Sequence, residues 1–324
     1  MSGKYEEERK YEEKIQNRLQ DVPAVISEYY YSLIGAGKSY ATAYCYINYV
    51  LSFIEYTFKG KANDNFYTNV KSVHVNKYIS SLRTKDVNGK MEKTSDSIRS
   101  VQWSALNSFF QFLVPDYLSS NPVANTQRPK MKDKPNVTYL TKDEISCLLN
   151  HVENTAQDKF KQRDLCLLKL GFSTGLRVSA IVQIDVDDID FKHNCIKVTE
   201  KGDHDVQIMF GDNLKTQIMQ CMADRKVHLD KGKSNALFLS QQGNRLSQRM
   251  VEILIAEYAA AVTDKHVTPH VMRHSCATNL YEATGDIYLC SKQLNHKQVS
   301  TTQRYAELSK EKQKKAANIL DGLL

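Results

Sequence analysis

The stretch Thr268-Pro269-His270-Val271-Met272-Arg273-His274 predicts a helix with an unusual polar face. Threonine followed by proline is typical of a helix start, with the threonine as N-cap and the proline in the first turn. On this helix His270, Arg273 and His274 stand at i, i+3 and i+4, so their side chains project from about one face. Burying two imidazoles and a guanidinium is costly unless they have partners or a ligand. We therefore expect this helix to carry a functional site.

The residues around this helix predict a second domain that is mostly α-helical with a small sheet. Thr141 and Glu144 have the spacing of a capping box, which marks the first helix of this domain. Gly175 is expected to end the helix that begins near Leu165. Two β-rich runs and the hairpin turn between them are predicted at residues 195–199, 206–210 and 201–204.

The first half of the chain has apolar and aromatic residues at helical spacing and predicts a four-helix domain. Gly35 and Gly37 separate the first two helices, and residues 73–82 and 98–113 repeat the pattern. Residues 128–135 contain two prolines and alternating cations without an apolar period, as in a semi-extended linker. The predicted division is a charged N-terminal segment at 1–19, a helical domain at 20–125, a linker at 126–137 and a second domain at 138–324.

The size and composition of the chain fit two globular domains without a membrane span. Its 324 residues, 41% hydrophobic and 25% charged, can form about two cores. No apolar run approaches the roughly 20 residues of a bilayer crossing, and the first residues lack the apolar stretch of a secretory signal. The seven cysteines include no C-x-x-C pair, and the nine histidines supply no partner set for zinc. We expect a cytoplasmic protein with no metal and no cofactor.

Basic residues are concentrated near the end of the first domain and in the linker. Residues 59–134 contain 13 Lys or Arg and 6 Asp or Glu, an excess that equals the net charge of +7 of the whole chain. Such clustering is the electrostatic pattern expected for a polyanionic partner such as double-stranded DNA. A solvated basic face is at least as common, so charge alone does not decide between the two interpretations.

Four polar residues elsewhere in the chain extend the pattern. Arg177 follows Gly175 and begins a helix, where a guanidinium and backbone N–H groups can bind one phosphate together. Lys201 lies at the predicted hairpin tip, and Tyr305 follows His296 by nine residues. Taken singly, a surface arginine or lysine is the commoner interpretation, and the chain has 18 tyrosines. Only the order and spacing of the whole set are specific.

In order and spacing, these motifs resemble the tyrosine recombinase (phage integrase) family, with the two-domain size of its Xer-like members. The resemblance covers about residues 20–310 and implies a C-shaped clamp on DNA. Its N-terminal part would be a four-helix, SAM-like core-binding domain, and its C-terminal part an α+β catalytic domain. The matching motifs are Gly175-Leu176-Arg177, Lys201-Gly202, His270-Val271-Met272-Arg273-His274, Leu294-x-His296 and Ser300-Thr301-Thr302-Gln303-Arg304-Tyr305.

The resemblance implies a site-specific DNA recombinase that cuts and rejoins strands through a 3′-phosphotyrosyl intermediate. Tyr305 would attack the phosphate, because a phenol oxygen can replace the 5′-oxygen of the DNA strand. Arg177 and Arg273 would bind the nonbridging oxygens, and His296 would add another donor. The ester conserves the bond energy, so rejoining by a 5′-hydroxyl needs neither ATP nor metal.

Proton transfer would fall to two other residues of the set. By resemblance, Lys201 would protonate the leaving 5′-oxygen and His270 would act as base or acid toward the tyrosyl oxygen. His274 would pack or orient its neighbours. Two positions depart from the family, since Ala180 stands where an acidic residue is common and Asn295 replaces the usual glycine. The first departure concerns how the loop of the first arginine is oriented, and the second alters a turn.

The resemblance also implies partners and leaves alternatives open. A homotetramer on two DNA sites is expected, formed in part by an apolar C-terminal tail at residues 311–324, and accessory proteins could take part. Integration, excision, resolution and inversion of DNA all remain open. The alternative functions are a catalytically inactive DNA-binding relative and a type IB topoisomerase. The complete residue set argues against the first, and the N-terminal domain and the tail favour recombination over the second.

Overall fold

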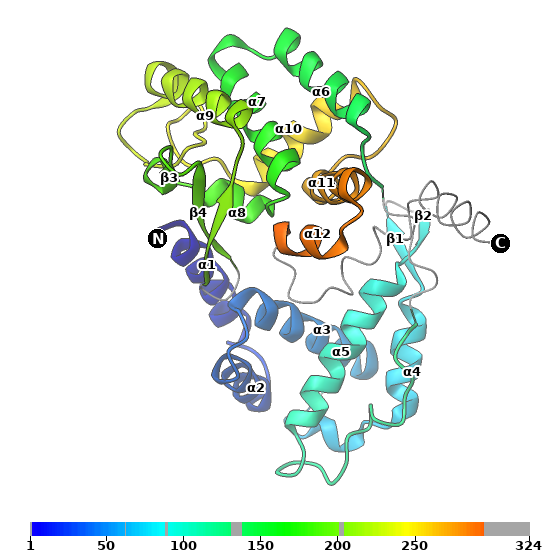
Figure 1. Ribbon diagram of the computed structural model, residues 1–324. Helices are drawn as coiled ribbons and strands as arrows, with labels where there is room; N and C mark the ends of the chain where they lie inside the picture. Colours follow the sequence, from blue (N-terminus) through cyan, green and yellow to red (C-terminus); the bar gives the residue numbers. More distant parts are fainter. Residues whose placement is uncertain (1, 62, 88–89, 131–137, 201–203, 295–324) are drawn as a thin grey trace, which may run out of the picture. The chain divides into compact units, whose positions relative to one another are not determined.

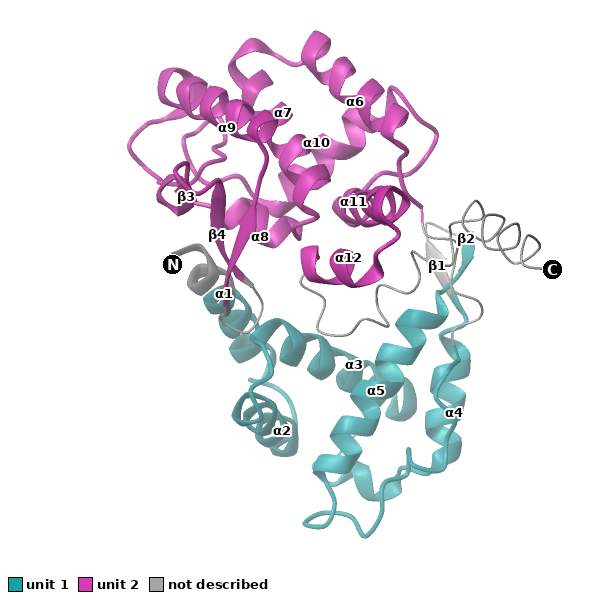
Figure 2. Ribbon diagram, in the orientation of Figure 1, with its two compact units in different colours: residues 1–134 teal, residues 135–324 magenta. Residues whose placement is uncertain are grey.

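The chain divides into two compact units, residues 1–134 and 135–324, shown in different colours in Figure 2. The computed structural model describes residues 2–61, 63–87, 90–130, 138–200 and 204–294. Each unit has its own hydrophobic core, and each is mainly helical with a small antiparallel sheet. The expected fold class, mainly α with a small sheet, is therefore confirmed. None of the described helices is long and apolar enough to span a bilayer.

The first unit is built around one central helix, α3 (Tyr40–Phe58), which packs against each of the other α-helices of that unit (Figure 1). The four helices expected from apolar spacing are present. Their ends follow local signals, since Ser39 and Ser95 cap α3 and α5 by accepting backbone N–H bonds. The remaining helices are α1 (Ser2–Arg18), α2 (Ala24–Gly35), α4 (Ser72–Ser81), α5 (Asp96–Phe112) and the 3-10 turn η1 (Phe66–Asn69).

The charged N-terminal segment forms α1, and this helix contributes to the core of the first unit. Ile15 is fully buried there, in the same cluster as Ile47, Phe53 and Phe109. Tyr11 of the same helix contacts an aromatic ring of α3, so two side chains anchor a helix that is otherwise mostly charged. In the structure α1 therefore belongs to the first compact unit.

A β-hairpin between α4 and α5 was not predicted from the sequence. Strands β1 (Thr84–Val87) and β2 (Lys90–Lys93) pair antiparallel, with Thr84 opposite Lys93 and Val87 opposite Lys90. The sequence signal is Asn88-Gly89, a pair strongly favoured in two-residue hairpin turns. Charged residues occupy both strands, so the apolar alternation that normally reveals a strand is missing.

The second unit contains most of the predicted elements. The capping box at α6 is confirmed, since Thr141 Oγ1 accepts the Glu144 N–H and the Glu144 carboxylate accepts the Thr141 N–H. The two predicted strands pair antiparallel, and a short third strand, β3, joins their sheet. The elements are α6 (Lys142–Thr155), α7 (Asp158–Thr174), α8 (Val178–Gln183), η2 (Val186–Asp188), β3 (Ile189–Asp190), β4 (Cys195–Glu200), β5 (His204–Met209), α9 (Asp212–Asp224), the π-turn η3 (Arg225–Leu229), α10 (Gln248–Ala260), α11 (Pro269–Thr284) and α12 (Ile287–Gln293).

Helix α7 lies in the centre of the second unit and contacts α6, α8, α9 and α11 (Figure 1). Because these neighbours surround the middle of α7, its consecutive residues 165–168 are all buried. Gly171 permits a close approach of α11, since a Cβ atom there would lie 2.3 Å from Met272 Cε. This contact brings α11 against the end of α7.

Candidate active site

The structure describes three of the six predicted catalytic residues, namely Arg177, His270 and Arg273. They belong to two neighbouring regions of the second unit, the turn between α7 and α8 and the first two turns of α11. The other three predicted residues, Lys201, His296 and Tyr305, lie outside the described residues, as does Asn295. The structure therefore describes the arginine side of the predicted site.

The turn before Arg177 is held by its backbone conformation. Gly175 ends α7 with a φ of +65°, a left-handed conformation that glycine adopts without steric cost. A Cβ atom at Gly175 would lie 2.6 Å from Leu294 Cδ2, so a side chain there would also collide with the end of α12. Leu176 is buried and donates its N–H to Thr174 Oγ1 at 3.3 Å. These contacts fix the conformation of the turn, and Arg177 follows it directly.

Arg177 occupies the N-cap position of α8, and its side chain is exposed. The prediction that this residue begins a new helix is confirmed. Ala180, where the family commonly has an acidic residue, is buried in the core of the unit. A carboxylate at this position is therefore not what orients the turn in this chain. The Gly175 conformation and the burial of Leu176 provide the constraint instead.

Arg273 joins two distant parts of the second unit. Its side chain is only 5% exposed, and one terminal nitrogen donates to the Gly175 carbonyl oxygen at 2.6 Å. The other terminal nitrogen donates to the Leu294 carbonyl oxygen, also at 2.6 Å. A guanidinium has five N–H donors, and its planar shape suits two acceptors at once. Arg273 therefore ties the turn before Arg177 to the point where the chain continues from α12 toward residue 296.

The start of α11 agrees with the sequence prediction. Thr268 is the N-cap and accepts the Val271 N–H at 3.3 Å, and Pro269 occupies the first turn. His270 is exposed at this end of the helix, while His274 is half-buried one turn further on. On the face predicted from the i, i+3, i+4 spacing, His270 is therefore exposed, Arg273 is buried and His274 is half-buried.

A buried thiol lies beside Arg273. Burial raises the pKa of Cys276 to about 12, although the positive charge of Arg273 opposes that shift. Its sulfur lies 3.2 Å from the position that a Cβ atom of Gly175 would take. Cys276 is buried against the turn at Gly175, so it acts as a packing residue in this site.

Thr174 and Cys276 were not predicted to shape this site, and Leu294 was predicted only as part of the motif Leu294-x-His296. Thr174 acts through its hydroxyl oxygen, Cys276 through packing and Leu294 through its carbonyl oxygen. The last two roles leave no side-chain signature in a sequence. The glycine at 175 was recognised as a helix end, but its contact with α12 depends on tertiary structure. Among the residues that the structure describes, no group of three or more His, Cys, Asp or Glu side chains could hold a metal ion.

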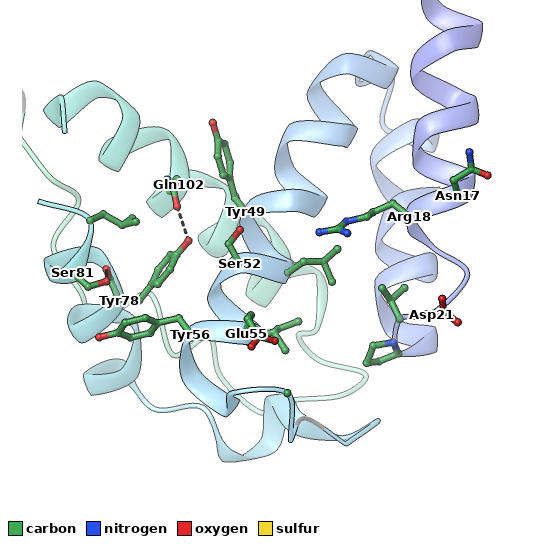
Figure 3. Close-up of a pocket in the computed structure, with 16 residues that line it drawn as sticks. Asn17, Arg18, Asp21, Tyr49, Ser52, Glu55, Tyr56, Tyr78, Ser81 and Gln102 are labelled. Carbon is green, nitrogen blue, oxygen red and sulfur yellow. Dashed lines mark hydrogen bonds between the residues drawn. The ribbon is translucent and has the colours of Figure 1, made fainter. Parts of the chain in front are cut away.

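The first unit has a groove of about 900 Å³, which is separate from the predicted residues (Figure 3). Its floor is α3, which contributes Tyr49, Ser52 and Tyr56, and one wall carries a hydrogen bond of 2.7 Å from the Tyr78 hydroxyl to Gln102. Arg18, Asp21 and Glu55 give the lining both signs of charge. None of the predicted catalytic residues lines this groove.

Comparison with known proteins places these features in a family. The sequence profile of the phage integrase family matches residues 138–312. The tyrosine recombinase XerD of Oceanobacillus iheyensis is 34% identical over 211 residues, which cover 64% of this chain and 70% of that protein. The match to the profile includes the turn at Arg177 and all of α11.

Solved structures share the fold at lower identity. The XerH site-specific recombinase bound to a palindromic difH substrate, in a post-cleavage complex, superposes with a TM-score of 0.70 at 21% identity and covers 88% of this chain and 81% of that one. A lambda integrase tetramer bound to a Holliday junction superposes with a TM-score of 0.67 at 16% identity and covers 87% and 76%.

Proposed function

This chain belongs to the phage integrase family, and from that premise we propose that Arg177, Lys201, His270, Arg273, His296 and Tyr305 form its catalytic set. Its function is that of a site-specific tyrosine recombinase, an enzyme that breaks and rejoins DNA strands. The observation that carries the proposal is the pair of bonds from Arg273 to Gly175 and Leu294. These bonds connect the turn of the first arginine to the chain that leads to the remaining residues of the set.

The chemistry follows from the needs of a phosphodiester. Arg177 and Arg273 would offset the charge that grows on the nonbridging oxygens during attack, with His296 as a further donor. Tyr305 would form a bond from its phenol oxygen to phosphorus as the bond from phosphorus to the 5′-oxygen breaks. The proximity of these groups supplies much of the rate, because the attack then needs no collision between free reactants.

Protons move at both ends of this displacement. Lys201 would give a proton to the departing 5′-oxygen, and His270 would take the proton of the attacking phenol. The exposed position of His270 at the start of α11 supports this role, since a proton acceptor must reach the substrate. In the joining step a 5′-hydroxyl attacks the phosphotyrosyl ester, and each proton returns.

Both units would bind DNA, and the second would also cleave it. We assign DNA binding around the cleavage site to both units, with residues 20–125 as the core-binding domain, residues 126–137 as the linker and residues 138–324 as the catalytic domain. The excess of basic residues at 59–134 supports this assignment, because each neutralised phosphate releases counterions. DNA as the partner also fits the substrate-bound state of the XerH recombinase. The cytoplasm is the compartment proposed for this reaction.

The enzyme would act as a homotetramer on two DNA sites, as the lambda integrase tetramer on a Holliday junction suggests. Residues 311–324, outside the described residues, contain an apolar stripe that could dock on a neighbouring subunit. Deleting residues 312–324 should weaken the pairing of two sites in a gel-shift assay while single-site binding remains. Undiminished pairing would reject the role of the tail. Accessory proteins could bias the reaction toward integration, excision, resolution or inversion.

A covalent trapping experiment tests the catalytic assignment. Incubating the protein with a nicked duplex of its target site should give a protein–DNA adduct that is absent in Tyr305→Phe. Tyr288→Phe is the matched control, because Tyr288 is 70% exposed on α12 and is not in the proposed set. No adduct with the wild type would indicate an inactive DNA-binding relative. Relaxation of supercoiled DNA without pairing of sites would indicate a topoisomerase.

A further inference from the structure

We propose that Ser275 and Asn279 are positioning residues for DNA cleavage, because they hold the start of the second unit against the helix that carries Arg273. The part that they hold is residues 139–141, called here the junction segment, which follows the predicted linker. The inference rests on the proposed function of Arg273. It adds two residues outside the catalytic set, which would act through α11 and would not touch DNA.

Both polar atoms of the Leu140 main chain bind side chains of α11. The Leu140 N–H donates to Ser275 Oγ at 2.8 Å, and Asn279 Nδ2 donates to the Leu140 carbonyl oxygen at 3.0 Å. Ser275 and Asn279 are four residues apart, so they occupy one face of the helix. Leu140 and Ser275 are both fully buried. A buried N–H or carbonyl group without a partner is costly, so these bonds fix the junction segment to α11.

The Ser275 hydroxyl is also bound to its own helix. It donates to the Val271 carbonyl oxygen at 2.7 Å while it accepts the Leu140 N–H. The hydroxyl hydrogen is therefore directed along α11, and a lone pair is directed at Leu140. This arrangement leaves little freedom for the junction segment to slide along the helix.

Lys265, in the loop before α11, holds the other side of the junction segment. Its ammonium group donates to the Tyr139 carbonyl oxygen at 2.9 Å and to the Glu144 carboxylate at 2.7 Å. Burial by itself would raise the pKa of Glu144, but the hydrogen bonds from Lys265 and Thr141 outweigh it, and the pKa is lowered. Glu144 is therefore charged at neutral pH. The junction segment is bound from two directions.

The location of these bonds gives them a consequence for catalysis. Ser275 is two residues after Arg273 on one rigid helix, and Arg273 reaches Gly175 and Leu294 through bonds of 2.6 Å. A pull on the chain before residue 139 acts on the Leu140 contacts with α11 and on the Lys265 contact with Tyr139. A displacement of about 1 Å at a reacting centre can lower a rate on the order of 100-fold. Holding α11 in place therefore protects the geometry of Arg273.

The test compares cleavage with stability in three variants of the full chain. Asn279→Asp is nearly isosteric but replaces the donor to Leu140 with a carboxylate, and Ser275→Ala removes the acceptor of the Leu140 N–H. Gln217→Ala is the matched control, because Gln217 is a buried residue of α9 that bonds to Gln162 of α7 at 2.8 Å. Three quantities are measured for each: the midpoint of urea unfolding, the Kd for the nicked target duplex, and the rate of adduct formation at saturating duplex.

We expect the rate at saturating DNA to fall about 10-fold or more in Asn279→Asp and Ser275→Ala, with the Kd changed less than about twofold. Gln217→Ala should lower the unfolding midpoint without changing the rate. Asn279→Asp adds a second readout, since a protonated carboxyl can again donate to Leu140. Its rate relative to wild type at the same pH should therefore rise as the pH is lowered toward about 5.

Two outcomes would overturn the inference. The first is a wild-type cleavage rate in Asn279→Asp, whatever its unfolding midpoint. The second is an equal loss of rate in Gln217→Ala, which would mean that any loss of stability slows cleavage. Should Ser275→Ala fail to fold, the half-buried Asn279 still decides the question. If the proposed function itself were wrong, the wild type would form no adduct, and this result can be distinguished from the two outcomes above.

Discussion

Helices α7 and α11 pack against each other, yet they do different work in the second unit. At its centre, helix α7 buries the apolar residues 165–168 in succession and packs against α6, α8, α9 and α11. Helix α11 uses its side chains to bind main-chain atoms of other segments, at Gly175, Leu294 and Leu140. The comparison separates two tasks, since α7 supplies stability through area buried and α11 supplies position through directed bonds. Substitutions in the two helices should then affect different measurements.

The largest effect is expected at Arg273. Arg273→Lys keeps the charge but cannot bridge two carbonyl oxygens with a planar fork, so adduct formation should slow by about 100- to 1,000-fold. Arg225→Lys is the control, because buried Arg225 also bonds two carbonyl oxygens, those of Ala236 and Ser234, away from the site. Single-turnover cleavage distinguishes the two. Equal slowing in both variants would mean that the loss of any buried bridging arginine slows cleavage, and would contradict a specific role for Arg273.

A core truncation in α7 should show the opposite pattern. Leu168 is fully buried, and Leu168→Ala should lower the free energy of unfolding by about 2–5 kcal/mol through lost contacts and a cavity. The cleavage rate of the folded fraction should stay near that of wild type. Urea unfolding and cleavage at low temperature measure the two quantities. A rate loss as large as that of Arg273→Lys would contradict the assignment of stability to α7 and of positioning to α11.

Gly175 lies where the two helices meet, so its substitution should affect both measurements. Gly175→Ala requires a left-handed alanine and places a methyl group against Leu294, at a cost of about 1–3 kcal/mol in unfolding free energy. Cleavage should slow as well, because the Arg177 turn shifts. Gly211→Ala is the control, since nothing lies within 4 Å of its added Cβ atom. Similar results for both variants would contradict the crowding at Gly175.

The smallest effect concerns pH and the junction segment. The folded-state pKa of Glu144 is lowered from its usual value of 4.5, so its stabilisation is present above that value and is lost as the pH falls through the folded pKa. Glu144→Gln keeps an acceptor for the Thr141 N–H and should cost less than about 1 kcal/mol at pH 7. Wild type should lose more stability than Glu144→Gln between about pH 5 and 3. Parallel curves would place the acid sensitivity elsewhere.

The sequence predicted the elements whose signals are local. The capping box at Thr141, the helix end at Gly175 and the N-cap at Thr268 depend on neighbours within four residues, and the structure confirms each. The β1–β2 hairpin escaped prediction because its strands lack an apolar face. The packing of α1 into the core of the first unit was not predicted for a related reason, since a single isoleucine does not make an amphipathic pattern.

The predicted site shows the same limit. The types and order of Arg177, His270 and Arg273 could be recognised, because side chains that act on a phosphate are drawn from a small chemical set. What Arg273 binds could not be predicted, because its acceptors are carbonyl oxygens 98 and 21 residues away. No pattern in a sequence records which main-chain oxygen a distant guanidinium will meet.

The choice of main-chain acceptors by Arg273 has a consequence for divergence within the family. Every amino acid has a carbonyl oxygen, so mutations at position 294 can change the side chain without deleting the acceptor. Lineages could therefore drift far apart in sequence and still inherit the same fixed arginine.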